Sequence, residues 1–510
     1  MINIVKRLDY LLIPFLFCIT RLPLLGWDIV NVDAPAWNYR SVQFISYIKN
    51  LNFLETYRTY HPGVTVMWLA GIGQEIYGHI HEFYIGTRPE YSIVGDFHWI
   101  LFSETLPIVI VNFLLILVLY HLLISLLNRK AAFFSTLLLV LEPFFIGNTR
   151  VLHLDGLLAL FGINSILFYI KYLSKHRKPL LFFSGVFFGL SVLTKVTGLV
   201  LLPVVFLISG IDIGGVISLR RVVKNLLIFL LSGFAVFVLM FPAMWATPWR
   251  VITKIINDGV LATGQGGQPQ IFFGDRTYNP GVFFYPLEFI FRSSPVLFLS
   301  LIGALFYNVL HFKKIWVKRE TVRVSTVINI FIYALVYLIF ITASSKKIDR
   351  YIIPLFPPLC IFAGVFLSEI YQRVGHILTV GIVVTFIFIT LPIFPDFFAF
   401  YNPLAGGTQM AVKVVGLQDW ATGYQRVVNY LHTKSEVQSL IVASYNDTSV
   451  RPIFKGTTIS FDKVTDFSKV DYAIVQRNES RLSEIKQFMR LDKIFYIGSY
   501  DYYYLYKNSQ

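Results

Sequence analysis

The chain has 510 residues, of which 55% are hydrophobic, 17% aromatic and only 14% charged. So small a polar share excludes a water-soluble globular protein. A net charge of +15 would suggest nucleic-acid binding in a soluble protein, but here the cations gather in short loops between apolar runs, as the positive-inside rule requires. We therefore expect a polytopic membrane protein whose partners include membrane lipids and no nucleic acid.

Apolar runs long enough to cross a hydrocarbon core of roughly 30 Å recur along most of the chain and predict about eleven membrane-spanning helices. They lie at about 8–26, 104–126, 131–147, 155–173, 180–196, 198–210, 224–245, 293–312, 324–343, 351–370 and 376–393. Lys195 and Gly198 interrupt one long apolar stretch, which we interpret as two short spans that meet at a polar turn.

The distribution of Lys and Arg predicts the orientation in a plasma or inner membrane. If the N terminus, with Lys6 and Arg7, is cytoplasmic, every short inside loop carries at least one cation, as the rule demands. An odd number of spans then sends the C-terminal region outside. The other outside segments are 27–103, 142–155, 246–292 and 343–350.

The chain divides into a membrane domain, residues 1–395, and an outside C-terminal region, residues 396–510. The first outside loop, 27–103, is expected to hold interfacial helices. In "DAPAWNYRSVQFISYIKN", the apolar residues recur at the spacing that places them on one face of a helix. In the C-terminal region, strand patterns such as "SLIVASY", "DYAIVQ" and "KIFYIGSYDYYYLYK" alternate with helix patterns. These predict a small α/β domain. The fold class is thus an all-α membrane protein with an α/β appendage.

Asp33 lies a few residues past the first span, on the outside face, in "VDAPAW". An aspartate before Ala-Pro-Ala is typical of a helix N-cap. A carboxylate at this membrane surface is also a candidate catalytic group. From the residues alone, both interpretations stay open.

The second outside segment places Arg150, His153 and Asp155 at the edge of a span. Charged groups at membrane depth are costly and often mark a functional interior site. The structural alternative is an Arg150–Asp155 ion pair that joins two spans. A His near an Asp also suggests a metal site, but no HExxH or repeated His/Cys pattern supports that interpretation.

A third cluster, "SSKKIDRYIIPL", places Lys346, Lys347 and Arg350 on the outside, against the bias of every inside loop. One nearby Asp349 cannot neutralise three cations. A phosphate at the membrane surface would do so, since Arg offers a two-pronged fork and Lys a point charge. The alternative is an interfacial patch that touches anionic lipid headgroups.

Taken together, these segments resemble the GT-C class of membrane glycosyltransferases, specifically the bacterial relatives of the dolichyl-phosphate-mannose protein O-mannosyltransferases and of the aminoarabinose transferase of lipid A. The resemblance covers nearly all of residues 1–430. Six motifs in order carry it: "VDAPAW" with "YHPGVTVMWLAG", "EPFFIGNTRVLHLDGLLALF", "GLSVLTKVTGL", "NPGVFFYPLEFIFRSSP", "SSKKIDRYIIPLFPPL" and "FYNPLAGG". The family often has Asp-Glu in its first loop. Here Ala34 follows Asp33, so only the first carboxylate carries over.

The resemblance implies an inverting transfer of a sugar from a polyprenyl-phosphate donor to an acceptor hydroxyl on a protein, lipid or glycan of the cell envelope. It implies that Asp33 is the general base and that Lys346, Lys347 and Arg350 bind the donor phosphate. Members related to protein mannosyltransferases generally work without a catalytic metal ion, so we expect neither metal nor cofactor. Further candidate site residues are His61, Arg150, His153, Asp155, Lys195 and Tyr351.

Two other functions compete with this one. A lipid or sugar transporter or flippase would also hold charges at membrane depth, but such proteins commonly show repeated halves, and the sequence has no internal repeat. A non-catalytic scaffold would use its C-terminal domain to bind a partner and keep the charges for structural purposes.

Overall fold

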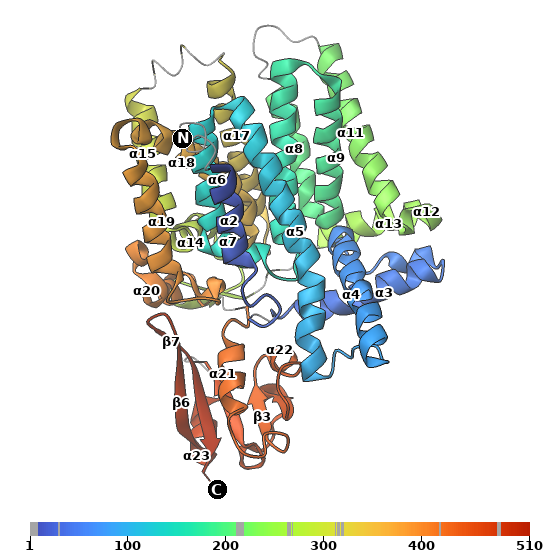
Figure 1. The fold of residues 1–510 in the computed structure, drawn as a ribbon, viewed down its shortest axis with the longest axis vertical. Coiled ribbons are helices and arrows are strands. Elements are labelled where there is room, and N and C mark those ends of the chain that lie inside the picture. Colours follow the sequence, from blue (N-terminus) through green and yellow to red (C-terminus); the bar gives the residue numbers. More distant parts are fainter. Residues whose placement is uncertain are drawn as a thin grey trace.

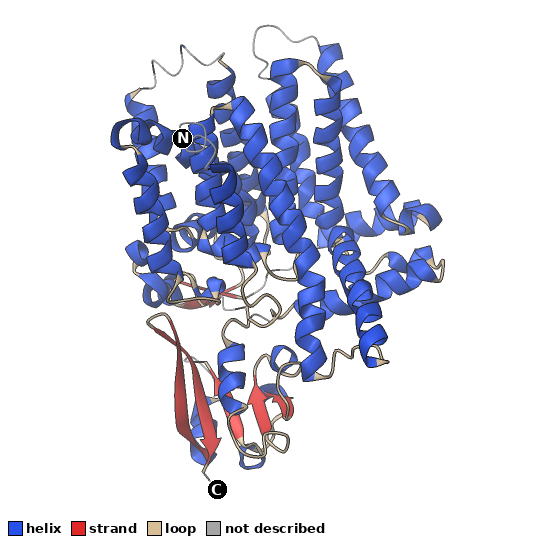
Figure 2. Cartoon of the chain, viewed as in Figure 1, coloured by secondary structure: helices blue, strands red, loops and turns tan. Residues whose placement is uncertain are grey.

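The computed structural model describes residues 9–28, 31–210, 219–262, 267, 269–311, 313, 317, 321–417, 420–476 and 481–509. Lys6 and Arg7, on which the predicted orientation partly rests, lie outside the described residues. Figures 1 and 2 show a helical bundle with a small domain of mixed helices and strands below it.

Helices occupy every segment where a span is predicted. They are α2 (Asp9–Arg21), α5 (Val94–Leu126), α6 (Arg129–Leu141), α7 (Pro143–Thr149), α8 (Asp155–Lys175), α9 (Lys178–Thr194), α10 (Leu201–Gly210), α11 (Leu219–Met240), α15 (Pro295–Leu310), α17 (Val322–Ala343), α18 (Phe356–Val374) and α19 (His376–Thr390). Among the described residues, five helices are long and apolar enough to cross a membrane, or six if the bent pair α6–α7 is one span. The all-α membrane architecture is confirmed, whereas the count of about eleven spans stays a prediction.

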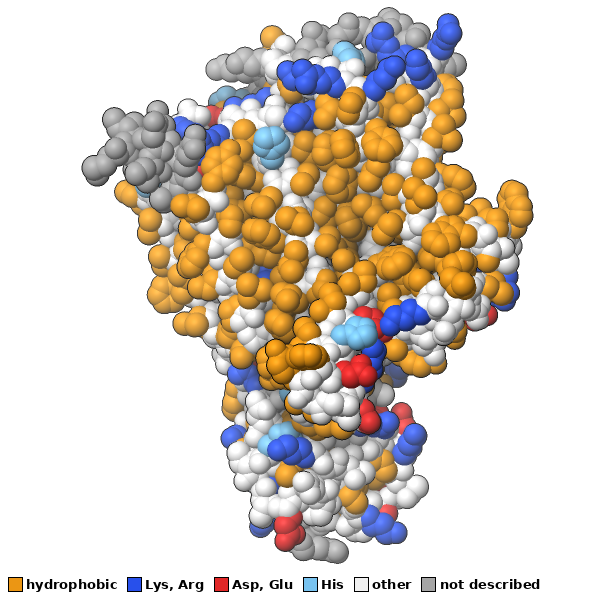
Figure 3. Space-filling model, turned by 45° about the vertical axis from the view of Figure 1, so that its right-hand side comes forward, with side chains coloured by type: hydrophobic (Ala, Val, Ile, Leu, Met, Phe, Trp, Pro, Cys, Tyr) orange, Lys and Arg blue, Asp and Glu red, His pale blue; other side chains and the backbone are white. Residues whose placement is uncertain are grey.

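The surface of the bundle carries a broad apolar band between two polar ends (Figure 3). At one end, which we call the basic end, α8 finishes at Lys175 and α9 and α11 begin. Lys178 and Arg220 lie in the first turns of these two helices, and Lys224 lies one turn further along α11. The opposite end, which we call the site end, carries the C-terminal domain (Figure 1). The band and the basic end are what a protein that spans a membrane requires.

The first outside loop holds the predicted helix, α3 (Ala34–Lys49), and a second helix, α4 (Val64–Ile85), joined through the short η1 (Phe53–Thr56). Trp37, Phe44 and Ile45 are buried on α3. The helix α5 begins at Val94, within the predicted loop 27–103, and its first turns bury Phe97 and Leu101. The outer bound of the loop near Ser103 stays a prediction.

Gly63 fixes the approach of the first loop to the bundle. Its φ of +61° suits glycine, and a Cβ at this position would lie 2.4 Å from the ring of Trp37. Its amide donates a hydrogen bond to the carbonyl of Thr194 at the end of α9. The preceding His61 is therefore held beside the break between α9 and α10.

That break confirms the predicted pair of short helices. α9 ends at Thr194, Lys195 has extended backbone, and η2 (Val196–Val200) leads into α10. The third outside segment begins with α12 (Ala243–Ala246) and α13 (Pro248–Lys254), which continues into the π-helical η3 (Ile255–Ala262). The hairpin β1 (Gln270–Phe272) and β2 (Asp275–Thr277) and the helix α14 (Phe284–Arg292) follow.

The C-terminal region forms the expected α/β domain. Its sheet has the order β4-β3-β5-β7-β6, in which β3 is parallel to β4 and β5, and β7 is antiparallel to β5 and β6. The strands are β3 (Ile441–Ser444), β4 (Thr457–Ser460), β5 (Tyr472–Val475), β6 (Met489–Ile497) and β7 (Tyr500–Asn508), and α21 (Tyr424–Leu431) and α23 (Leu482–Phe488) are its longer helices. The segment "KIFYIGSYDYYYLYK" is a hairpin and not one strand, because Gly498 has a φ of +59° at the turn.

Candidate active site

Asp33 directly precedes α3, but its side chain makes no capping hydrogen bond to that helix. Its Oδ2 lies 3.0 Å from Nη2 of Arg350 and 3.5 Å from Nε2 of His153. The side chain is 36% exposed. The N-cap interpretation is therefore wrong for the carboxylate. This group forms ion pairs instead and remains partly exposed to a substrate.

Asp155 opens α8 and is buried, with a side chain only 1% exposed. Its Oδ1 accepts a 2.7 Å hydrogen bond from Nζ of Lys195, at the break between α9 and α10. Its Oδ2 lies 3.3 Å from Nδ1 of His153 and 3.4 Å from Nε of Arg350. A buried charge requires such partners, since isolation of an ionised carboxylate from water is expensive.

His153 and Arg350 thus connect the two carboxylates. We call Asp33, His153, Asp155, Lys195 and Arg350 the carboxylate cluster. Burial alone would raise the pKa of Asp33, but the interaction with His153 and the charge of Arg350 outweigh it and hold this pKa well below its usual range. Asp33 is accordingly ionised at neutral pH.

Arg150 does not belong to the cluster. Its Nη2 lies 2.6 Å from Oδ2 of Asp28, and its guanidinium also donates to the carbonyls of Pro23 and Thr20. It is fully buried. The proposed Arg150–Asp155 pair is therefore wrong, because a nearer carboxylate satisfies Arg150 and ties the end of α7 to the segment after α2.

The basic triplet separates into three environments. Arg350 joins the carboxylate cluster, whereas Lys347 is 2% exposed and its Nζ donates to the carbonyls of Thr342 and Ser344 at 2.6 and 3.0 Å. Lys346 lines a cavity. Asp349 serves a different cation, with its Oδ2 2.7 Å from Nη2 of Arg292.

The cavity beside the carboxylate cluster has a volume of about 290 Å³. Its polar lining includes His61, Lys195, Lys346 and Tyr351. Apolar walls come mainly from the following side chains: Val196, Leu199, Val260, Tyr337, Phe340 and Ile341. An apolar chain that ends in an anion matches such a lining.

His61 and Tyr351 complete the polar lining of this cavity. Burial, followed by the nearby Lys195 charge, lowers the pKa of His61 well below its usual range, so that the imidazole is neutral at neutral pH. Lys195 lies over the ring of Tyr351, with Nζ 4.2 Å from the ring centroid. Lys195 therefore contacts the carboxylate cluster and the cavity at once.

Trp420, from the C-terminal region, packs on the carboxylate cluster and was not among the predicted site residues. Its ring lies 4.7 Å from that of His153 and 4.6 Å from Cζ of Arg350. It also packs on Phe398, at a ring separation of 5.0 Å. The available signal was a single tryptophan in a polar stretch, "LQDWATG", which pointed to no particular partner.

Within the described parts of the chain, no three His, Cys, Asp or Glu side chains are grouped as metal ligands. The expectation of a reaction without a catalytic metal stays a prediction.

Comparison with known proteins bears on this arrangement. Residues 93–245 match the family model described as dolichyl-phosphate-mannose-protein mannosyltransferase. A comparison with curated proteins finds no match. The structure is similar to that of ArnT from Cupriavidus metallidurans bound to undecaprenyl phosphate, with a TM-score of 0.53 and 14% sequence identity over 98% of this chain and 97% of that one.

The chain has the GT-C fold. A second similar structure is the apo oligosaccharyltransferase of Archaeoglobus fulgidus, with a TM-score of 0.51 and 12% identity over 92% of this chain and 69% of that one. The resemblance to the mannosyltransferase and aminoarabinose transferase relatives, predicted from the sequence, is confirmed. The family match includes His153, Asp155 and Lys195 but ends before Arg350.

The buried Asp155–Lys195 pair predicts strong coupling in a double-mutant cycle. Lys195→Met removes the shortest contact of a buried carboxylate and should lower the free energy of unfolding by about 3 kcal/mol. Addition of Asp155→Asn should restore most of that loss. Thermal unfolding of the purified variants in detergent measures both effects. Lys224→Met, at an exposed lysine of α11, is the control, and additive effects of the two site substitutions would contradict the pairing.

Proposed function

We propose that the protein is an inverting glycosyltransferase that moves a sugar from a polyprenyl-phosphate donor to an acceptor hydroxyl at the outer membrane face. One observation carries the proposal: Lys195 lines an apolar cavity and at the same time binds Asp155 in the carboxylate cluster that contains Asp33. The cavity can hold a lipid tail, its cations can bind the phosphate, and Asp33 in the adjoining cluster can act as the base for the acceptor. The family match and the likeness to an ArnT bound to undecaprenyl phosphate support this assignment.

In this mechanism, the acceptor oxygen attacks the anomeric carbon as the bond from that carbon to the phosphate oxygen breaks. The acceptor proton passes to the Asp33 carboxylate, which is ionised and 36% exposed. The polyprenyl phosphate leaves with the bonding electrons and needs charge stabilisation more than a proton. A single displacement of this kind inverts the anomeric configuration.

The cations of the cavity supply that stabilisation. Lys346 lines the cavity, and no ion pair engages it within the described residues, while Lys195 approaches from the cluster. The interaction with His153 and the charge of Arg350, which is shared between Asp33 and Asp155, keep Asp33 a weak base in this arrangement. A donor phosphate that draws Arg350 toward itself would raise the pKa of Asp33 and strengthen the base at the moment it is needed.

The orientation follows from the two ends of the bundle. The basic end carries Lys175, Lys178, Arg220 and Lys224 and belongs in the cytoplasm by the positive-inside rule. The carboxylate cluster and the C-terminal domain then lie outside, where polyprenyl-phosphate sugars and envelope acceptors meet.

Asp33→Asn should reduce transfer at least about a hundredfold, because an amide cannot accept the acceptor proton, whereas general-base catalysis contributes roughly 10²–10⁴-fold. Donor binding should be nearly unchanged. Transfer of labelled sugar by purified protein, with binding of the polyprenyl-phosphate sugar measured separately, checks both statements. Full activity of Asp33→Asn would contradict the mechanism. Movement of the intact lipid across a bilayer, without its consumption, would favour the transporter instead.

The neighbours Lys346 and Lys347 offer a matched test of the phosphate site. Lys346→Ala should raise the KM for the donor about tenfold, since it removes a charge from the cavity, and should leave thermal stability nearly unchanged. Lys347→Ala should lower thermal stability, because two carbonyls lose their donor, while the KM of the folded enzyme stays close to that of the wild type. Steady-state kinetics and thermal unfolding separate the two, and the reverse pattern would refute the placement of the phosphate.

A further inference from the structure

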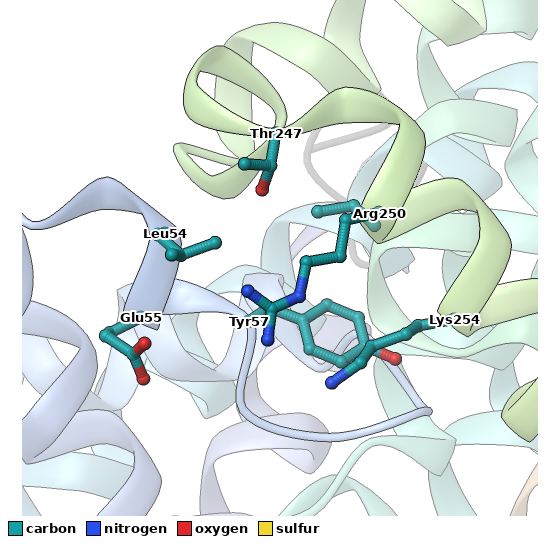
Figure 4. A pocket seen from close by; sticks show the side chains of 7 residues that line it. Leu54, Glu55, Tyr57, Thr247, Arg250 and Lys254 are labelled. Carbon is teal, nitrogen blue, oxygen red and sulfur yellow. The ribbon is translucent and has the colours of Figure 1, made fainter.

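A second pocket lies between the first loop and α13, apart from the donor cavity in its lining. Leu54, Glu55 and Tyr57 line it from one side, and Thr247, Arg250, Val251 and Lys254 line it from the other. Its volume is about 90 Å³, enough for a phosphate group. Figure 4 shows the Arg250 and Lys254 side chains extending from α13 toward Tyr57, with Glu55 across from them.

The charges of this pocket are unbalanced. Two cations face one carboxylate, and within the described residues neither Arg250 nor Lys254 forms an ion pair. Lys254 lies over the Tyr57 ring, with Nζ 5.4 Å from its centroid. The lining residues themselves therefore carry one net positive charge, which favours an anion, while the carboxylate of Asp258 lies outside the lining but near Tyr57. Arg and Lys four residues apart on one helix face are suited to a phosphate, which takes the Arg fork and the Lys point charge together.

Two hydroxyl groups of the lining lack partners. The Tyr57 hydroxyl and the Thr247 Oγ1 are buried, and neither has a hydrogen-bond partner in the described structure. Both hydroxyls are therefore available to hydrogen-bond with an oxygen of a molecule bound in the pocket. Burial, followed by the charge of Asp258, raises the pKa of Tyr57 to about 12, so the phenol keeps its proton and can donate to an anionic oxygen.

Exposed aromatic side chains place this pocket at the membrane surface. Trp245 is 51% exposed and Trp249 is 80% exposed, and both lie on the segment that carries the two cations. The Trp245 ring also packs against Phe53, 5.1 Å away, on the opposite wall. Tryptophans in such positions sit at the headgroup level of a bilayer. An anion at this depth belongs to a lipid rather than to the surrounding solution.

We propose that Tyr57, Thr247, Arg250 and Lys254 form a binding site for the phosphodiester headgroup of an anionic membrane lipid such as phosphatidylglycerol. The site does not depend on the proposed glycosyl transfer. It does adjoin the donor cavity through one helical segment, because α13 continues into η3, whose Gly259 and Val260 line that cavity. A headgroup bound to α13 therefore anchors one wall of the cavity against the first loop.

The test uses the full chain in phosphatidylcholine nanodiscs with and without phosphatidylglycerol. Native mass spectrometry of the released protein measures the phosphatidylglycerol that it retains. Arg250→Ala/Lys254→Ala should weaken retention roughly thirtyfold, as expected for two cations at a membrane surface. Tyr57→Phe and Thr247→Val preserve the charge and should each weaken retention by a smaller factor of about five.

Arg220→Ala/Lys224→Ala is the matched control, since it removes an exposed Arg and Lys at the same spacing from the basic end of α11. It should leave retention of the bound lipid within about twofold of the wild-type value. An equal loss in this control would show diffuse attraction and overturn the site. Displacement of the lipid by inorganic phosphate at a matched concentration would overturn the assignment to a lipid. Thermal unfolding of each variant confirms that retention is compared between folded proteins.

Discussion

The buried carboxylate of Asp155 constrains everything around it. A charge isolated from water costs several kcal/mol unless partners compensate it, and Asp155 obtains three: Lys195, His153 and Arg350. Lys195 lies at the break between α9 and α10, and Arg350 lies in the short 3-10 helix Asp349–Leu355 that precedes α18. Two of these partners also reach Asp33. The residues that neutralise Asp155 therefore also hold Asp33, the candidate base, in position.

The main architecture follows from simple physical rules. Apolar runs between basic loops predicted the helices of the bundle, and the change of pattern beyond residue 396 predicted the α/β domain. The break at Lys195 could be predicted, because a charged residue interrupts an apolar run there. Its partner could not be predicted, since Asp155 lies 40 residues away and no local sequence pattern indicates the ion pair.

The predictions from the sequence were wrong or incomplete where long-range contacts or side-chain directions determine which residues interact. Arg150 and Asp155 are near in sequence, yet Arg150 pairs with Asp28, which lies close only after α2 packs on the bundle. Lys346 and Lys347 are neighbours of equal charge, but their side chains point to different surroundings. Trp420 reaches the carboxylate cluster from beyond the predicted boundary at residue 395. Phe398 supports it from the same region, so the C-terminal region completes the site that the bundle begins.

A structure of the protein with a bound polyprenyl phosphate would test the central claim most directly. We predict that the prenyl chain occupies the cavity of about 290 Å³, with the phosphate in contact with Lys346 and Lys195 and the Asp33 carboxylate open toward the acceptor side. A phosphate bound at Arg250 and Lys254 instead, with this cavity empty, would contradict it.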